Sequence, residues 1–429
     1  MANLQSIAHA ETVIDEFKDS MHDRALVVGA GFAGATAARY LAKNSMDTSV
    51  LLVEAQKAPC QRIKCGEGVS ERLFSDVELQ PRDEWISTRI SKIHMIYPNG
   101  KMAYYKASGY ILDKRKTIQD LSKEAERVGA KLLTSTRVTD YDQYTKEVTL
   151  RVVEQNGRHK DFVVEPNIVI GCDGTNSTIG RRSGLLTEDE WRRCALALGY
   201  RVEDYEVKSD VIGSISTDTI YFVCPRNRNI GYGWIFPKGK DQINMGIGIP
   251  GYLRGEQPYK LLREFMTEHG ISGNLVEWLS GALPSFGPPA KIFTDGVMLV
   301  GDAARQINPI TFGGNRAAAI AGRIAGEIAS EAFERKDTSE IFLKTYQDKC
   351  IRLGMYDPAL YESTKFYFGD GSLETLNFIG DLFENSDLRS PVAKMRAVFR
   401  MLCKSERPLS FSDLSTLERA ETLFLEIGW

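Results

Sequence analysis

The chain has no apolar run approaching the ~20 residues that a membrane-spanning helix needs, and its N-terminus lacks the charged-then-apolar pattern of a signal peptide. Its 7 cysteines are an odd number scattered through 429 residues, which does not fit a disulfide framework. There is no excess of one charge, because 54 basic residues face 57 acidic ones without a basic block. These absences exclude an integral membrane protein and predict a cytoplasmic protein that does not bind nucleic acid.

The histidines also lack the spacing that metal ligands have in a sequence. The histidines are scattered at His9, His22, His94, His159 and His269, and the GxSxG, HExxH and P-loop patterns do not occur. We therefore expect no metal site. Hydrophobic residues at 43% and charged residues at 26% are ordinary values for a globular protein, and the length predicts at least two structural lobes.

A nucleotide-binding pattern lies near the N-terminus. Residues 24–34 read RALVVGAGFAG, a short apolar run with glycines, and residues 35–43 are good helix formers. A second apolar run, 50–53, ends at Glu54, about 20 residues past the last glycine. This order of strand, turn, helix, strand and acid predicts a βαβ unit. Glu54 would accept hydrogen bonds from ribose hydroxyls, so the site suits FAD or NAD better than NADP.

The glycines of this pattern have separate expected roles. Gly29 allows a tight turn, Gly31 allows the backbone to approach a pyrophosphate, and Gly34 allows the helix to pack closely on the strand. A glycine turn without a ligand is the alternative interpretation.

The remaining chain predicts further elements. A helix is expected over 117–128, a hairpin at Asn156-Gly157, a separate sheet over 195–250 and a return to the nucleotide lobe with a strand at 297–300 and a helix near 313–334. We expect an α/β plus α+β protein with a Rossmann-like lobe, an antiparallel-sheet lobe and a helical C-terminal region. The expected parts are 1–23 as an extension; 24–84, 108–185 and 285–335 as the nucleotide lobe; 85–107 and 186–284 as the substrate lobe; and 336–429 as the helical region.

Two more motifs follow predicted strands. Asp173-Gly174 follows the apolar run 168–170, and Gly301-Asp302 follows 297–300. Asp302 could bond a ribitol hydroxyl, and backbone amides at the start of the next helix could meet the flavin edge where negative charge gathers on reduction. Taken alone, each motif also fits an ordinary turn with a capping aspartate.

In this order the three motifs resemble the FAD-dependent family typified by p-hydroxybenzoate hydroxylase, over residues 24–334. Two further stretches narrow the resemblance. Tyr232-Gly-Trp234-Ile-Phe236-Pro237, with Gly246-Ile-Gly248 after it, is similar to the aromatic signature of geranylgeranyl reductases, and residues 64–68, KCGEG, are similar to their Cys-Gly motif.

The resemblance implies an FAD-dependent reductase that saturates isolated C=C bonds of a geranylgeranyl or related prenyl chain. Alternate residues of a strand share a face, so Tyr232, Trp234 and Phe236 would form an apolar wall for the chain. Pro237, Gly246 and Gly248 complete the expected substrate site. The Cys65-Gly66 turn is the expected catalytic element, with the Cys65 thiol as a proton source or, alternatively, as a buried small hydrophobe.

The sequence departs from the family at one place. Matching Leu121, Ala125 and Gly129 puts Lys114 where relatives carry arginine, with Arg115 beside it, and either could reach the FAD pyrophosphate. The full set of expected cofactor-binding residues is Gly29, Ala30, Gly31, Ala33, Gly34, Glu54, Ala55, Lys114, Arg115, Val138, Asp173, Gly174, Gly301, Asp302, Pro309, Gly313, Gly314 and Asn315.

Several points stay open at this stage. A flavin monooxygenase or halogenase shares the fold, although Tyr232 and Phe236 depart from the halogenase motif, and a non-catalytic prenyl-binding chaperone is the alternative of another class. The expected substrate is a prenyl lipid or a prenyl diphosphate, and such a substrate implies peripheral membrane contact. The electron donor is NADPH, ferredoxin or another electron-donor protein.

Overall fold

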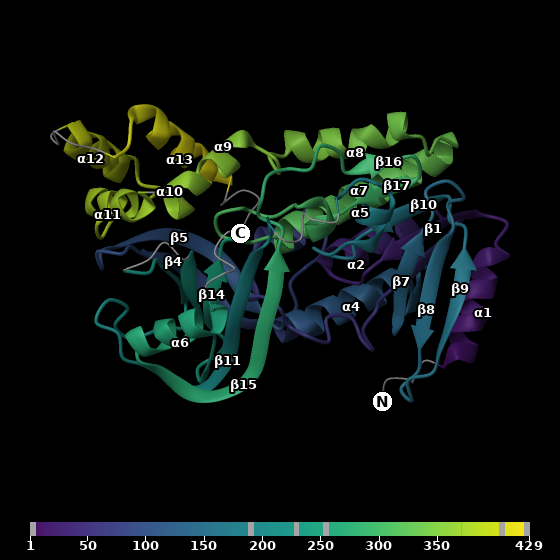
Figure 1. Ribbon diagram of the computed structural model, residues 1–429, viewed down its shortest axis with the longest axis horizontal. Helices are drawn as coiled ribbons and strands as arrows, with labels where there is room; N and C mark the ends of the chain where they lie inside the picture. Colours follow the sequence, from purple (N-terminus) through teal and green to yellow (C-terminus); the bar gives the residue numbers. More distant parts are fainter. Residues whose placement is uncertain are drawn as a thin grey trace.

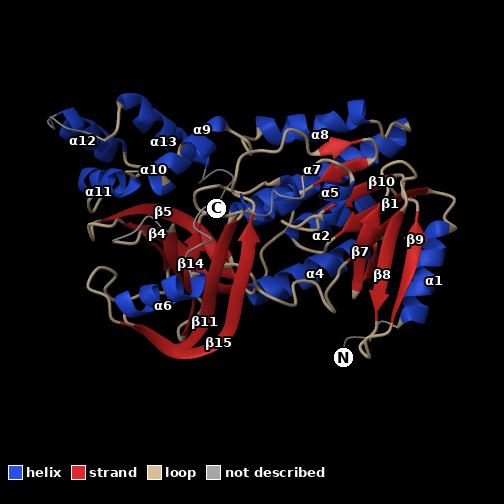
Figure 2. Cartoon of the chain, viewed as in Figure 1, coloured by secondary structure: helices blue, strands red, loops and turns tan. Residues whose placement is uncertain are grey.

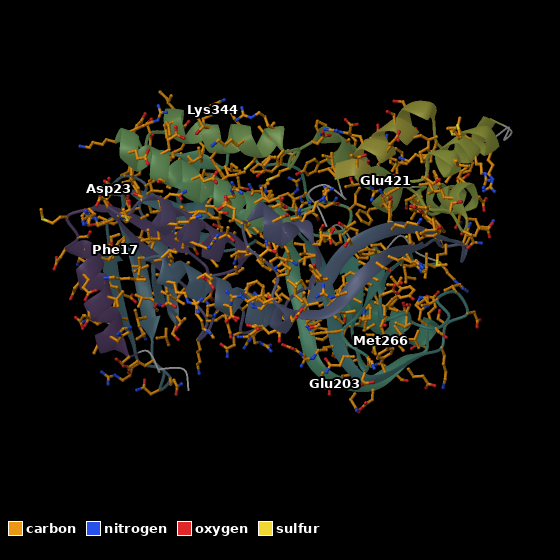
Figure 3. The ribbon with its side chains drawn as sticks, turned by 180° about the vertical axis from the view of Figure 1, so that it is seen from behind. Phe17, Asp23, Glu203, Met266, Lys344 and Glu421 are labelled. Atoms are coloured by element: carbon orange, nitrogen blue, oxygen red, sulfur yellow. The ribbon has the colours of Figure 1, made fainter. Side chains whose placement is uncertain are left out.

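The computed structural model describes residues 6–187, 193–226, 231–251, 257–369, 371–402 and 408–423. Two lobes lie side by side, with a row of helices along one side of both (Figure 1). Seen from behind, Phe17 and Asp23 mark the first lobe, Glu203 and Met266 mark the second, and Glu421 lies among the C-terminal helices (Figure 3). The expected N-terminal extension and C-terminal region are described only in part, because residues 1–5, 370, 403–407 and 424–429 lie outside these ranges.

The first lobe is built on a six-stranded sheet in the order β16-β17-β10-β1-β2-β6. All neighbours pair in parallel except β16 with β17. The strands are β1 (Asp23–Val28), β2 (Thr48–Val53), β6 (Lys131–Leu133), β10 (Ile168–Gly171), β16 (Phe293–Thr294) and β17 (Val297–Leu299). Strands from three distant segments of the chain therefore meet in one sheet, which confirms the predicted Rossmann-like lobe and its late completion.

Helices cover this sheet, and two of them pack unusually closely. They are α2 (Phe32–Asn44), α4 (Lys114–Arg127) and α7 (Asn315–Arg335). A Cβ atom at Gly322 of α7 would lie 2.3 Å from the carbonyl oxygen of Ala33 in α2, and one at Gly326 would lie 2.7 Å from that of Ala37. Side chains at these two positions would push α7 off α2. The helix expected at 117–128 begins earlier, at Lys114, because the Asp113 side chain caps the backbone N–H of Lys116 at 3.0 Å.

A small three-stranded sheet flanks the first lobe. It contains β7 (Thr136–Tyr141), β8 (Val148–Val153) and β9 (His159–Val164), with β8 and β9 paired antiparallel around the predicted Asn156-Gly157 turn. The N-terminal helix α1 (Ile7–Lys18) packs on this sheet and buries Ala10, Ile14 and Phe17. The part of the expected extension that the structure describes is therefore a helix held against the first lobe.

The second lobe is an eight-stranded sheet in the order β15-β11-β14-β13-β12-β4-β5-β3. Its neighbours are antiparallel except β12 with β4, which are parallel. The strands are β3 (Gly68–Ser70), β4 (Ile86–Ile96), β5 (Met102–Leu112), β11 (Ala195–Val207), β12 (Thr219–Val223), β13 (Tyr232–Pro237), β14 (Gln242–Ile249) and β15 (Ile271–Leu283). The boundary expected between 107 and 108 falls inside β5, and β3 also joins this sheet.

Helices close both sides of the second sheet. Helix α6 (Pro258–Glu268), which is not among the expected elements, covers one face through Leu261, Leu262 and Phe265. The C-terminal helices cover the other, and Figure 2 shows them above β4 and β5. The helices over this face are α10 (Thr364–Phe368), α11 (Ser372–Phe383), α12 (Pro391–Leu402) and α13 (Phe411–Leu423). Helix α8 (Glu340–Arg352) packs instead on α7 and β16 of the first lobe, and α9 (Pro358–Glu362) packs on α13. Among the described residues, none of the helices has the length and hydropathy to cross a membrane.

Candidate active site

The glycine turn follows β1 and has the tight geometry that its sequence requires. Gly29 has a φ of +96°, and a Cβ there would lie 2.5 Å from the carbonyl oxygen of Cys172. At Gly34 a Cβ would lie 1.8 Å from the carbonyl oxygen of Gly29. At Gly31, by contrast, no protein atom lies within 4 Å of a Cβ. Gly31 therefore borders open space, as expected of a residue that approaches a ligand.

Glu54 directly follows β2 and faces the glycine turn. Its carboxylate accepts hydrogen bonds from the backbone N–H groups of Ala30 at 2.9 Å and Gln56 at 2.8 Å. The side chain is 8% exposed. Of the other expected residues here, Ala33 is buried in α2, Ala55 is exposed and Val138 is buried within β7.

The other two strand-end motifs lie at the same edge of the parallel sheet, because parallel strands have their carboxyl ends together. Gly301 has a φ of +68°, and Asp302 follows it in a short 3-10 turn, η4 (Gly301–Ala304). Burial raises the pKa of Asp302, while the nearby Lys114 and Lys64 lower it. A carboxyl group that is shielded from water at this edge can hydrogen-bond a ligand hydroxyl, such as one of a ribitol chain.

Asp173 has a local structural role. Its carboxylate accepts hydrogen bonds from Ser177 Oγ at 2.5 Å and from the backbone N–H groups of Thr178 at 2.6 Å and Ile179 at 3.1 Å. It thus caps the short helix α5 (Thr178–Arg182). Gly174 has a φ of +78° and supplies the turn. These contacts match the capping-turn interpretation of this motif.

The segment before α7 is also held by side-chain hydrogen bonds. Asn308 Oδ1 accepts from the backbone N–H groups of Ile310 at 2.8 Å and Thr311 at 3.1 Å, which fixes the turn around Pro309. Gly313 and Gly314 then lead into α7, where Asn315 is the first residue. The backbone amides at this helix start are available to an anionic group.

Lys114, rather than Arg115, points into the nucleotide site. Lys114 Nζ lies 3.2 Å from Cys65 Sγ and 2.8 Å from Asn315 Oδ1. Burial lowers the pKa of Lys114, but the adjacent sulfurs of Cys65 and Cys60 outweigh this effect and raise it overall. Arg115 extends to the second lobe instead, where its Nη2 donates to Glu277 Oε1 at 2.8 Å.

The Cys65 turn lies where the two lobes meet. A Cβ at Gly66 would lie 2.6 Å from the Phe236 ring, so the backbone of the turn rests directly on the aromatic strand. Asn244 Nδ2 donates to the Cys65 carbonyl oxygen at 2.9 Å, and the backbone N–H of Glu67 points to Cys65 Sγ at 3.4 Å. The turn is therefore fixed from the second lobe while its thiol faces Lys114 of the first.

A buried ion pair supports this turn, and no local sequence pattern indicates it. Lys238 Nζ donates to Glu67 Oε2 at 2.9 Å, and their side chains are only 9% and 3% exposed. Asn244 Nδ2 also donates to Glu67 Oε2 at 3.2 Å, and Trp234 Nε1 donates to Asn244 Oδ1 at 3.0 Å. Glu67, Lys238 and Asn244, here called the Glu67 network, link the Cys65 turn to the aromatic strand.

The three aromatic side chains of β13 lie on one face of the sheet, where they form the aromatic wall. Trp234 and Phe236 share one apolar cluster with Tyr232 packed on it, whereas Ile235 belongs to the cluster on the opposite face. The rings of Tyr232 and Phe312 stack at 5.5 Å, and Phe222 lies 5.2 Å from Tyr232 and 5.4 Å from Phe236. Phe222 and Phe312, absent from the expected set, extend the wall.

Glycines allow the rings to lie flat on the sheet. A Cβ at Gly246 would be 2.5 Å from the Trp234 ring, and one at Gly248 would be 2.8 Å from the Phe312 ring. Pro237 ends β13. Tyr232, Trp234, Phe236, Gly246 and Gly248 therefore come together on one face of the sheet, next to the Cys65 turn. Pro237 does not join them, because it pairs with Ile243 and shares the opposite face with Ile235.

The arrangement fits a flavin dinucleotide. The open space at Gly31, the acid at the end of β2 and the helix start at Asn315 are the features that hold such a cofactor. The Cys65 turn lies between that edge and the aromatic wall. Among the residues that the structure describes, no group of acidic, histidine or cysteine side chains could hold a metal ion.

Comparison with known proteins gives consistent results. Residues 207–283 match the geranylgeranyl reductase catalytic domain, and residues 23–242 match an FAD binding domain. Digeranylgeranylglycerophospholipid reductase 2 of Methanopyrus kandleri is 34% identical over 373 residues, which cover 85% of this chain and 91% of that protein. Digeranylgeranylglycerophospholipid reductase 1 of Methanococcoides burtonii is 32% identical, covering 92% and 98%.

Solved structures share the fold. A geranylgeranyl bacteriochlorophyll reductase-like protein from Thermoplasma acidophilum superposes with a TM-score of 0.76 at 24% identity, covering 94% of this chain and all of that one. A flavin-dependent halogenase gives a TM-score of 0.64 at 17% identity, covering 94% and 77%. At these identities the structural likeness concerns the fold alone.

Proposed function

Because this chain belongs to the geranylgeranyl reductase family of FAD-dependent oxidoreductases, we propose that it reduces the isolated double bonds of a glycerophospholipid that carries two geranylgeranyl chains. One observation carries the proposal: the Cys65 turn rests on Phe236 of the aromatic wall, while the Cys65 thiol faces Lys114, which also bonds Asn315 at the nucleotide edge. A prenyl chain on the wall would thus lie beside the cofactor edge.

The residues that would hold FAD are those at the carboxyl edge of the parallel sheet. Gly31 and the start of α7 would meet the phosphates and the flavin edge, and Glu54 the ribose. The positive charge of Lys114 would attract the anionic pyrophosphate of the cofactor. FAD held there would, once reduced, supply the hydride for one alkene carbon, and the other carbon would take up a proton.

The protein's own contribution is placement and a proton. An isolated alkene has no carbonyl group to polarise, so orientation in a dry pocket provides much of the rate. Tyr232, Trp234 and Phe236 form a rigid surface for the chain. Cys65 is the proposed proton donor, and the Lys114 ammonium group, 3.2 Å from its sulfur, would stabilise the thiolate that remains when the proton leaves. The proposed electron donor is NADPH or a ferredoxin.

The proposed reaction can be tested directly. The purified protein is reduced anaerobically with dithionite and mixed with detergent-dissolved digeranylgeranylglycerophospholipid. We expect flavin reoxidation and products that gain two hydrogens for each double bond. The fully saturated lipid is the control and should leave the flavin reduced, and geranylgeranyl diphosphate tests the alternative head group. Reoxidation by oxygen alone would replace this proposal with a monooxygenase or halogenase reaction.

The role of Cys65 has a separate test. We expect Cys65→Ala to bind FAD normally but to reoxidise with lipid about a hundredfold more slowly, the usual loss when a positioned proton donor is removed. Stopped-flow absorbance measures this rate. Cys60→Ala is the matched control, because burial raises the pKa of the Cys60 thiol to about 11 and the reaction does not use it. A Cys65→Ala protein with the full rate would exclude the thiol as proton donor.

A further inference from the structure

The outward face of α12 is apolar although it faces solvent. Val392, Met395 and Val398 are 50%, 66% and 39% exposed. Their spacing of three residues puts them on one side of the helix. A helix that only closed a lobe would carry polar residues on this side. The outward apolar face, defined as Val392, Met395 and Val398, is therefore suited to a contact outside the chain.

Positive charge borders this face. Helix α12 contains Lys394, Arg396 and Arg400 and no acidic residue. Arg396 and Arg400 are exposed and, together with Val392 and Met395, line a surface hollow of about 430 Å³. The partner of this surface is therefore expected to combine negative charge with hydrocarbon.

The three cations are held differently. Lys394 pairs with Glu418 of α13 at 2.9 Å. Arg400 Nη1 donates to the carbonyl oxygens of Asp381 and Leu382 at the end of α11, at 3.0 and 2.9 Å. Within the described ranges, Arg396 makes no ion pair. Arg396 is thus the cation most available to an external anion.

The inner side of α12 leads to the aromatic wall. Ala397 and Met401 are buried in the same apolar cluster as Trp234 and Phe236. Helix α11 lies between α12 and β5, and Figure 1 shows α12 at the outer end of the second lobe, away from the nucleotide sheet. Apolar side chains are therefore continuous from beneath the outward face to the proposed prenyl site.

We propose that the outward apolar face of α12 docks on the surface of an anionic lipid bilayer. Val392, Met395 and Val398 enter the boundary between head groups and acyl chains, and Arg396 and Arg400 contact lipid phosphates. This docking rests on the proposed function in one respect, namely that a lipid substrate must be taken from a bilayer. It would place the C-terminal helices between the membrane and the aromatic wall.

Vesicle binding tests the docking independently of turnover. The full-length FAD-loaded protein is sedimented with vesicles of phosphatidylglycerol and phosphatidylcholine, or of phosphatidylcholine alone. We expect stronger binding to the anionic vesicles, weakened by salt. Met395→Glu should reduce this binding about tenfold, because it puts a charge in the apolar contact, and Arg396→Gln about fivefold, the usual contribution of one cation. Met46→Glu, the same change at a residue that is 94% exposed in the first lobe, should bind like the unmodified protein.

An activity comparison separates this inference from the proposed function. Met395→Glu should keep its rate on detergent-dissolved lipid and lose it on lipid in vesicles. Equal vesicle binding by Met395→Glu and the unmodified protein would overturn the docking, even if the reductase activity is found. A dimer in solution that Met395→Glu dissociates would also overturn it, because a second copy would then cover the face. Absence of reductase activity with intact vesicle binding would overturn the proposed function alone.

Discussion

Glu67→Gln is expected to lower the free energy of unfolding by about 3 to 5 kcal/mol, the cost of leaving one buried charge without its partner. The variant keeps the size of the side chain but leaves the Lys238 ammonium group unpaired, and both side chains are almost fully buried. Lys238→Met should cost a similar amount. Urea unfolding at one fixed FAD concentration measures both.

The double variant Glu67→Gln, Lys238→Met separates the charge from the packing. Because no unpaired charge remains, it should be more stable than either single variant. Asp161→Asn is the matched control, since its pair with Arg151 is about 40% exposed on both sides and its loss should cost less than about 1 kcal/mol. If Glu67→Gln costs no more than Asp161→Asn, the Glu67 network does not stabilise the Cys65 turn.

The second large effect concerns the glycine turn, where two glycines should respond in opposite ways. Gly34→Ala would place a methyl group 1.8 Å from the Gly29 carbonyl oxygen and 3.3 Å from Cys172 Cβ. The helix must then move off the strand. We expect a loss of more than about 3 kcal/mol in stability and no bound flavin.

Gly31→Ala should leave the protein folded and still prevent FAD binding. No protein atom lies within 4 Å of the new methyl group, and Gly31 has a φ of −79°, which alanine adopts easily. The methyl group would, however, stand where a pyrophosphate approaches. FAD affinity is expected to fall about 100-fold, or roughly 3 kcal/mol. Thermal unfolding without FAD and flavin fluorescence titration measure the two quantities, and normal FAD affinity of Gly31→Ala would mean that the phosphates lie elsewhere.

The sequence predicts those parts of the fold that depend on local order. The glycine turn, the Asn156-Gly157 hairpin and the aromatic face of β13 are all recognisable because their determining residues are neighbours along the chain. Helix α6 and the long strand β15 were missed. Strand β15 contains Gly273 and Gly281 and has exposed apolar residues, so its strand character comes from pairing with β11 rather than from a local pattern.

The candidate site could be predicted only in part, because several of its contacts do not follow from residues that are neighbours along the chain. Glu67 and Lys238 are 171 residues apart, so neither sequence position indicates the other. Lys114 and Arg115 are adjacent cations, and only the helix orientation decides that Lys114 enters the site while Arg115 meets Glu277. Asp173 fitted both a cofactor and a capping role in the sequence, and its three capping hydrogen bonds are visible only in three dimensions.

The close contact of α7 with α2 also affects how the protein can be made. Strands β1, β10 and β17 are neighbours in one sheet although they begin at residues 23, 168 and 297. Gly322 and Gly326, which allow α7 to pack closely on α2, come after all three strands in the chain. During synthesis on the ribosome, β1 therefore gains its neighbour β10 only after residue 171 has been made, and the first lobe closes only when Arg335 has emerged. Such late, non-local pairing makes folding slow. The nascent chain must be protected from aggregation for most of its translation, and FAD can bind only near the end of it.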